Sequence, residues 1–219
     1  MKRIGVTQRV ERLPGRGERR DCLDQRWVTL LAGLCIDAVP VPNGLDDVAA
    51  WARRQQLEGL LLTGGNDLCG LPEAGNTAPE RDATEGRLLE WAADTVLPVL
   101  GVCRGLQFIN HYLGGRLSRV EGHVAVHHEL VPEPSGPLAG LYTRVNSFHD
   151  WAVHPGELAE GLTALAHAPD GTVEAFRHER LGWLAIMWHP EREEPFRLAD
   201  LDLIRAVFDT DNVDSNDRE

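Results

Sequence analysis

The feature of this sequence that most restricts its fold is a cysteine that lies between a short apolar run and an amphipathic segment. Residues 98–102 (PVLGV) predict a strand that is buried on both faces, and Cys103 follows at once. Apolar residues then recur at helical spacing over 106–113, until two glycines end the segment. Gly101 and Gly105 flank the cysteine and permit a sharp turn. The pattern predicts that the Cys103 side chain projects from the edge of a sheet as a nucleophile.

The rest of the chain alternates between predicted strands and predicted helices. Further strands are expected over 4–7, 59–63, 172–177 and 183–188. Further helices are expected around 27–34, over 84–95 and around 201–208, because apolar residues recur there on one helical face. Strands that alternate with helices predict an α/β sandwich.

The length of the chain and the composition of its last residues indicate its domain organisation. Residues 1–208 are expected to form a single domain, because the length is within the range of one domain and no long linker divides the sequence. Residues 209–219 hold five acidic residues, one arginine and almost no apolar side chains. This composition cannot offset the entropy cost of ordering, so we expect a disordered acidic tail.

Composition and charge exclude several classes of function. The chain is 42% hydrophobic and 26% charged, which is typical of a globular protein, and its formal net charge is -12. A strongly acidic protein repels phosphate backbones, so bulk nucleic acid is not an expected partner. No apolar run is long enough for a signal peptide or a bilayer span, so we expect a cytoplasmic protein with no membrane partner. Its four cysteines should then be thiols, and a homo-oligomer is left open.

A cysteine nucleophile needs a base for its proton and a group that orients the base. The segment Trp188-His189-Pro190-Glu191 offers both, directly after a predicted strand. His189 would therefore lie at a carboxyl end of the sheet, where the active sites of α/β proteins gather. The chain has nine histidines, and a single histidine is more often a surface or satisfied core residue, so spacing alone leaves that alternative open.

Three segments of the sequence resemble known signature blocks in the same order and spacing. Residues 61–67 (LLTGGND), 101–107 (GVCRGLQ) and 188–191 (WHPE) resemble those of class I glutamine amidotransferases, a superfamily that includes the peptidase C26-like proteins. Within it, residues 79–82 (PERD) and 145–149 (VNSFH) are most similar to the γ-glutamyl-γ-aminobutyrate hydrolase group. The resemblance implies a three-layer, flavodoxin-like sandwich with a mostly parallel central sheet.

The resemblance also implies roles for individual residues. Cys103 corresponds to the nucleophile, His189 to the general base and acid, and Glu191 to the residue that orients His189. The backbone N–H groups of Gly65 and Arg104 correspond to the oxyanion hole, so side-chain changes at Arg104 should be tolerated better than changes at Gly65. The pocket for the glutamyl group is implied at Gln107, Asn146, Ser147, Phe148 and His149. No cofactor is implied.

The substrate implied by the resemblance is a small-molecule γ-glutamyl amide, which is cleaved through a glutamyl thioester. Residues 1–20 carry seven basic side chains against two acidic ones, which favours either a solvated charged loop or contact with an anionic leaving group. A narrower resemblance, over 4–9, 63–68, 145–149 and 187–193, is to the γ-glutamyl-CDP-amidate hydrolases of capsule synthesis. The alternatives are amine catabolism, as in γ-glutamyl-γ-aminobutyrate hydrolases, a glutaminase subunit of a separate synthase, and a non-catalytic binding relative.

Three neighbouring histidines raise the question of a metal site. His123, His127 and His128 lie close together in the sequence, but no cysteine or carboxylate set of known spacing accompanies them. On this basis, no metal site is expected.

Overall fold

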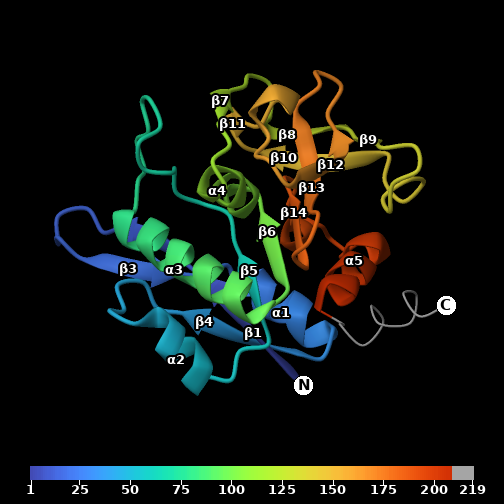
Figure 1. Ribbon diagram of the computed structural model, residues 1–219. Coiled ribbons are helices and arrows are strands. Elements are labelled where there is room, and N and C mark those ends of the chain that lie inside the picture. The colour runs from blue at the N-terminus through green and yellow to red at the C-terminus, as the bar shows by residue number, and fades with distance from the viewer. Residues whose placement is uncertain (209–219) are drawn as a thin grey trace.

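The computed structural model describes residues 1–208, in which eight strands form one sheet between two layers of helices (Figure 1). Five neighbouring strands are parallel, and they are β4 (Ile36–Val41), β1 (Lys2–Thr7), β5 (Gly59–Leu62), β6 (Val99–Val102) and β14 (Trp183–Ile186). The sheet continues with three antiparallel strands, β13 (Val173–His178), β12 (Leu162–His167) and β9 (Val131–Pro132). The expected three-layer sandwich with a mostly parallel sheet is confirmed.

Helices cover both faces of the sheet, and each face has its own apolar core. One face packs against α2 (Val48–Arg54), α3 (Pro79–Thr95) and α4 (Arg104–Tyr112), and the other against α1 (Gln25–Gly33) and α5 (Leu198–Phe208). In β5, Leu60 and Leu62 join the first core and Leu61 joins the second, and all three are fully buried. This two-sided burial is the physical reason why the strand is a continuous apolar run.

The expected elements all occur, with shifted ends. The five expected strands agree with β1, β5, β6, β13 and β14 to within two residues at either end. Helix α3 begins at Pro79, five residues before the expected start. Proline fits the first helical position, and Glu80 and Asp82 favour the positive end of the helix dipole, so polar residues extend this helix beyond its apolar face.

Several elements were not expected from the sequence, and they include β4, β9 and β12 of the main sheet and helix α2. Three antiparallel pairs lie outside the main sheet, and they are β2 (Arg9–Arg12) with β3 (Arg19–Cys22), β7 (Ser118–Arg119) with β11 (Trp151–Ala152), and β8 (Val124–Glu129) with β10 (Arg144–Phe148). Two 3₁₀ turns, η1 (Pro155–Glu157) and η2 (Pro190–Arg192), also occur. The strands of the three pairs are short and rich in polar residues, so they lack the apolar runs by which buried strands are recognised.

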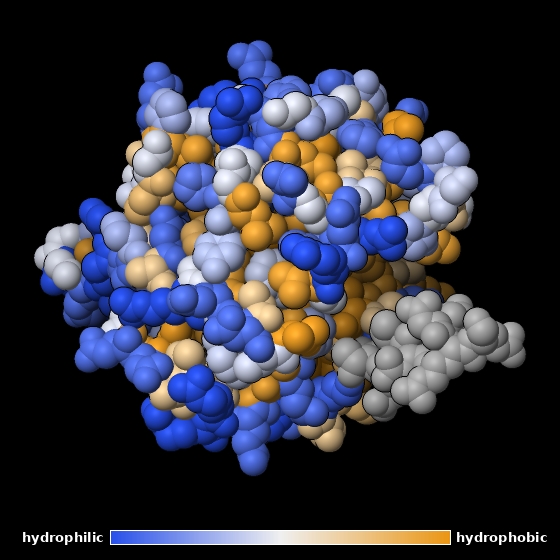
Figure 2. All heavy atoms as spheres, in the orientation of Figure 1, coloured by the Kyte–Doolittle hydropathy of each residue, from blue (hydrophilic) through white to orange (hydrophobic). Residues whose placement is uncertain are grey.

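The surface of the molecule is largely polar on the face shown in Figure 2, where hydrophilic side chains predominate and apolar ones gather towards the right, near α5 in Figure 1. Among residues 1–208, no helix combines the length and the apolar character that a membrane crossing requires. The acidic tail predicted for 209–219 lies outside the described residues.

Candidate active site

Cys103 occupies a sharp turn between β6 and α4, which meet near the centre of Figure 1. Its φ is 52° and its ψ is -105°, a conformation that non-glycine residues rarely adopt. A Cβ atom at Gly101 would lie 2.8 Å from the carbonyl carbon of Gly105, and one at Gly105 would lie 2.2 Å from the Leu62 carbonyl oxygen. Both glycines are therefore required by close backbone packing, and the turn has the geometry of a nucleophile elbow.

His189 follows β14 and lies beside Glu191. The His189 Nδ1 and the Glu191 Oε1 are 2.6 Å apart, and both side chains are almost completely buried. Within the described residues, the other ring nitrogen, Nε2, has no hydrogen-bond partner. A Cβ atom at Gly64 would lie 2.8 Å from the His189 Cε1 and 3.6 Å from the Cys103 Cβ, so the two side chains flank Gly64. The fold thus brings the thiol, the imidazole and the carboxylate together.

Electrostatics at this site favour a thiolate beside an imidazolium. Burial raises the pKa of the Cys103 thiol, but the interactions with His189 and the charge of His149 together lower it more, and the resulting pKa is below that of an ordinary thiol. Burial lowers the pKa of His189, but Cys103 and Glu191 raise it more, and the resulting pKa is above that of an ordinary imidazole. A thiolate is the nucleophilic form of cysteine, so this pair is prepared for attack on a carbonyl carbon.

The loop that follows β5 is held by a fully buried arginine. The Arg81 guanidinium donates hydrogen bonds to the carbonyl oxygens of Thr63, at 2.6 Å, and of Gly64, at 3.0 Å. In a trans peptide the C=O and N–H point in opposite directions, so the N–H of Gly65 points away from Arg81. This orientation is compatible with the oxyanion role expected of Gly65.

The side chain of Arg104 is buried and charged, and it forms ion pairs with Asp82 and Glu85. Glu85 also accepts a hydrogen bond from the Arg81 Nε, at 2.8 Å, so the four charges form one buried network. The expectation that side-chain changes at Arg104 are tolerated better than changes at Gly65 did not take this burial into account, and removal of one partner leaves uncompensated buried charges. Sequence reasoning missed this network, although Arg81 and Glu85 have the i, i+4 spacing of a helical ion pair.

Asn146 holds the backbone of His189. The His189 N–H donates to the Asn146 Oδ1, and the Asn146 Nδ2 donates to the His189 carbonyl oxygen, both at 2.9 Å. The same Nδ2 also donates to Glu193 at 2.7 Å, so both donors of the amide are used. The sequence-based interpretation was contact with the glutamyl group, whereas these bonds favour a role in positioning His189.

The remaining residues expected to bind substrate have the following contacts. The Ser147 hydroxyl is buried and donates to the His123 carbonyl oxygen at 2.7 Å. The ring of Phe148 packs edge-on against His189, with 5.6 Å between ring centroids. Gln107 lies one helical turn after Cys103, and its Nε2 donates to the Trp151 carbonyl oxygen at 2.8 Å. The His149 Nδ1 is 2.9 Å from that same oxygen.

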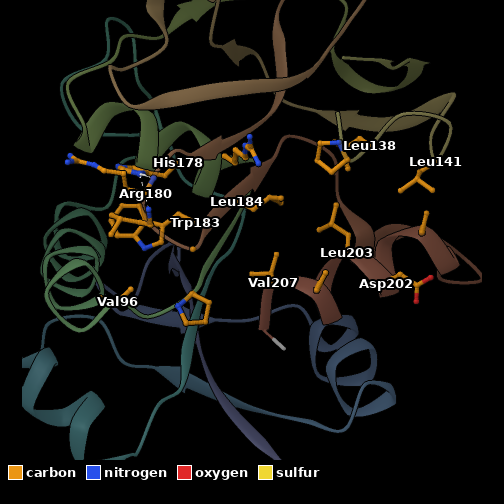
Figure 3. Close-up of a pocket in the computed structure, with 17 residues that line it drawn as sticks. Val96, Leu138, Leu141, His178, Arg180, Trp183, Leu184, Asp202, Leu203 and Val207 are labelled. Carbon is orange, nitrogen blue, oxygen red and sulfur yellow. Dashed lines mark hydrogen bonds between the residues drawn. The ribbon is translucent and has the colours of Figure 1, made fainter. Parts of the chain in front are cut away.

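Two cavities differ in their relation to these residues. A small cavity of about 60 Å³ lies beside His189 and Glu191 and is also lined by Gly64, Gly65 and Arg9. A larger, mostly apolar cavity of about 620 Å³ lies elsewhere, between α5 and the β13–β14 region (Figure 3). None of the candidate site residues lines the larger cavity, so the small polar cavity is the candidate entrance to the site.

Comparison with known proteins gives the family. A family model described as Peptidase C26 matches residues 3–191, which include Cys103, His189 and Glu191. The chain belongs to the peptidase C26 family. This membership confirms the resemblance drawn from the three sequence blocks.

One relative of similar sequence agrees with this membership, and two solved structures share the fold. A γ-glutamyl-CDP-amidate hydrolase of Campylobacter jejuni is 32% identical over 191 residues, which cover 87% of this chain and 90% of that protein. A crystal structure of a GMP synthase component from Thermoplasma acidophilum has a TM-score of 0.68 at 22% identity, with 95% and 93% of the two chains covered. A glutamine amidotransferase of Thermotoga maritima has a TM-score of 0.63 at 12% identity, with 97% and 86% covered. The two structures support the fold.

Proposed function

We propose that this chain is a cysteine-dependent hydrolase that cleaves the γ-glutamyl amide bond of a small molecule. The observation that carries the proposal is the Cys103 elbow beside the hydrogen-bonded pair of His189 and Glu191. Membership of the peptidase C26 family and the similarity to a γ-glutamyl-CDP-amidate hydrolase support the same reaction class.

The proposed reaction has two halves. The Cys103 thiolate attacks the γ-carbonyl carbon, and backbone N–H groups of Gly65 and Arg104 stabilise the oxyanion that forms. His189 gives its proton to the leaving amine, the C–N bond breaks, and a glutamyl thioester forms on Cys103. His189 then takes a proton from water, the water oxygen attacks the thioester, and glutamate leaves. Glu191 orients the imidazole in both halves.

The leaving group is proposed to be nucleotide-linked, which makes γ-glutamyl-CDP-amidate the substrate, with glutamate and cytidine diphosphoramidate as products. The side chain of Arg9 lines both the small cavity beside His189 and a polar cavity of about 370 Å³ that Arg12, Asn76 and Thr77 also line. The Arg9 Nε has no hydrogen-bond partner within residues 1–208, and its ion pair with Glu11 is half exposed. A cationic side chain at this junction favours an anionic group next to the scissile amide.

The experiment measures glutamate release by the purified full-length protein from γ-glutamyl-CDP-amidate, γ-glutamyl-γ-aminobutyrate and glutamine, with Cys103→Ala as control. We expect the nucleotide amide to give the highest kcat/KM, and the control to be inactive on all three. A preference for γ-glutamyl-γ-aminobutyrate would instead support amine catabolism. Glutamine cleavage that requires an added synthase would support the role of a glutaminase in a synthase complex, and full activity of Cys103→Ala would overturn the mechanism.

Arg9→Gln tests the leaving-group proposal separately. We expect KM for γ-glutamyl-CDP-amidate to rise about tenfold, which is the loss of roughly one charge-assisted hydrogen bond, while cleavage of glutamine is unchanged. Arg53→Gln, on the surface of α2, serves as the matched control. An equal effect of Arg9→Gln on both substrates would show that Arg9 does not recognise the nucleotide.

A further inference from the structure

Three histidines and a glutamate converge beside the candidate active site. His123 precedes β8, His128 lies in β8, His149 follows β10, and Glu174 lies in β13, and these strands lie close together in Figure 1. Each residue offers one ligand atom, and the four atoms lie within 4.8 Å of one another. The exposed fractions of the side chains are 7% for His123, 14% for His128, 1% for His149 and 0% for Glu174.

The atoms that face the centre of this cluster have no hydrogen-bond partners within residues 1–208. They are the Nδ1 of His123, the Nε2 of His128, the Nε2 of His149 and both carboxylate oxygens of Glu174. A buried carboxylate without partners is costly, and buried charges in proteins are paired or bound to metal ions. The Glu174 carboxylate must therefore be compensated either by protonation of the imidazoles that face it or by a bound cation.

The hydrogen bonds of the outward-facing ring nitrogens determine whether the inward-facing ring nitrogens have free lone pairs. The His128 Nδ1 lies 2.8 Å from the Glu129 carbonyl oxygen, and the His149 Nδ1 lies 2.9 Å from that of Trp151. A carbonyl only accepts, so both Nδ1 atoms donate, and in the neutral rings the inward Nε2 atoms have free lone pairs. The His123 Nε2 lies 2.9 Å from the Asp170 carboxylate, which accepts a hydrogen bond from it. In the neutral His123 ring, the inward Nδ1 therefore has the free lone pair. Such outer hydrogen bonds are typical of histidines that bind metals.

The spacing of the inward atoms fits a metal ion better than direct hydrogen bonds. Glu174 oxygens lie 3.8 Å from the His123 Nδ1, 3.7 Å from the His128 Nε2 and 3.5 Å from the His149 Nε2. Hydrogen bonds between such atoms would be about 2.7–3.2 Å long. Ligands of a tetrahedral Zn²⁺ with bonds of about 2.0–2.1 Å are about 3.3 Å apart, so small side-chain shifts would complete the site.

We propose that His123, His128, His149 and Glu174 bind a Zn²⁺ ion. Three imidazole nitrogens disfavour Mg²⁺ and Ca²⁺, which prefer oxygen ligands, whereas four mixed nitrogen and oxygen ligands suit zinc. Four protein ligands close the coordination sphere, which is typical of a structural site. The ion fastens the β8–β10 pair to β13 of the central sheet, and so supports the strand that carries Asn146.

The sequence alone did not show this site. The prediction of no metal considered His123, His127 and His128, but His127 is 51% exposed and contacts Glu193 instead. Neighbouring residues of a strand point to opposite faces, so β8 directs His128 towards the cluster and His127 away from it. The other two ligands, His149 and Glu174, lie far along the chain and join the cluster only through the tertiary fold.

Metal content is the direct test. The full-length protein is stripped with a chelator, equilibrated with ZnCl₂, freed of excess metal, and measured by elemental analysis. We expect one equivalent of zinc in the wild type, and loss of it in Glu174→Gln and His128→Ala. The matched controls His127→Ala and Glu133→Gln, both exposed, should retain it. Absence of zinc from the wild type, or equal zinc in all variants, would overturn the proposal.

A second measurement on the wild type does not depend on variants that fold. Co²⁺ is added to the stripped protein after its cysteines have been alkylated, and the visible spectrum is recorded. We expect the intense absorption of tetrahedral Co²⁺, and a melting temperature that rises with added Zn²⁺ because the ion binds only the folded chain. If neither change occurs, the cluster is a set of protonated histidines paired with Glu174, and the metal site is excluded.

Discussion

The parallel and antiparallel parts of the central sheet support their polar groups in different ways. In the parallel part, β5, β6 and β14 are apolar runs, and the candidate catalytic groups follow where these strands end. In the antiparallel part, Glu174 lies within β13 itself and is fully buried. The histidines that face it come from β8 and from segments next to β8 and β10, outside the main sheet.

The two parts of the sheet differ in how a polar side chain can be accommodated. The carboxyl ends of parallel strands meet at one edge, so a functional group can follow an apolar run and still reach the site. A carboxylate within a buried strand must instead be compensated by other segments, which have to pack over it. The two parts should therefore respond differently to substitution, and the Asn146 contact with His189 links the β8–β10 pair to the end of the parallel strand β14.

The largest expected effect is at the end of the parallel strands. Cys103→Ala should lower kcat/KM by about 10⁴-fold or more, because it removes the attacking atom. Zinc content should be unchanged, which would show that the two parts act independently. Cys69→Ala is the control, since burial raises the pKa of that thiol and makes it a poor nucleophile. Comparable losses in both variants, measured as glutamate release, would contradict the assignment of Cys103 as the nucleophile.

A substitution in the buried charge network behind the elbow should have the next largest effect, which is on stability. Arg104→Met should lower the free energy of unfolding by about 3–5 kcal/mol, because Asp82 and Glu85 lose a buried partner. Urea denaturation measures the change. Arg53→Met on the exposed surface should alter stability by no more than about 0.5 kcal/mol. If Arg104→Met were as mild as this control, the burial of the network would contribute little to the fold.

The contact between β10 and the segment after β14 should show an intermediate effect on turnover. Asn146→Ala should reduce kcat by about 10- to 100-fold with KM nearly unchanged, because His189 loses the amide that positions its backbone. Asn43→Ala, which removes contacts to Gln8 and Asp21, should leave kcat unchanged. A rise in KM for Asn146→Ala at constant kcat would instead support the substrate contact that the sequence predicts.

The smallest effect is a gradual pH dependence. The pKa of Cys103 is lowered, so the thiolate persists below the ordinary thiol value of 9.0, and activity should fall only as pH drops beneath the shifted value. The pKa of His189 is raised, so its imidazolium persists above 6.5 and is lost as pH rises through the shifted value. We expect a plateau of kcat/KM that extends from the lowered pKa of Cys103, below 9.0, to the raised pKa of His189, at about 10, in steady-state assays. A sharp maximum inside that window would contradict the ion pair.

The candidate catalytic residues of the parallel part could be predicted because their signals are local. Cys103 is marked by an apolar run before it, glycines around it and a helical pattern after it, all within a short segment. The segment from Trp188 to Glu191 is marked in the same way by the strand before it and by its family resemblance. Roles for these residues are proposals, but the proximity of Cys103, His189 and Glu191 agrees with the interpretation of the sequence.

What the sequence by itself determined was five of the eight strands of the main sheet, four of the helices, the layered fold and the position of Cys103 at a sheet edge, because periodicity and turn residues encode local structure. What only the tertiary structure decided was the set of partners of each buried polar group. Arg104 with Glu85, Asn146 with His189, and the four residues of the proposed zinc site are examples. Such partners are distant in sequence. A polar group that is buried away from water needs a partner, but the local sequence does not show which residue that partner is.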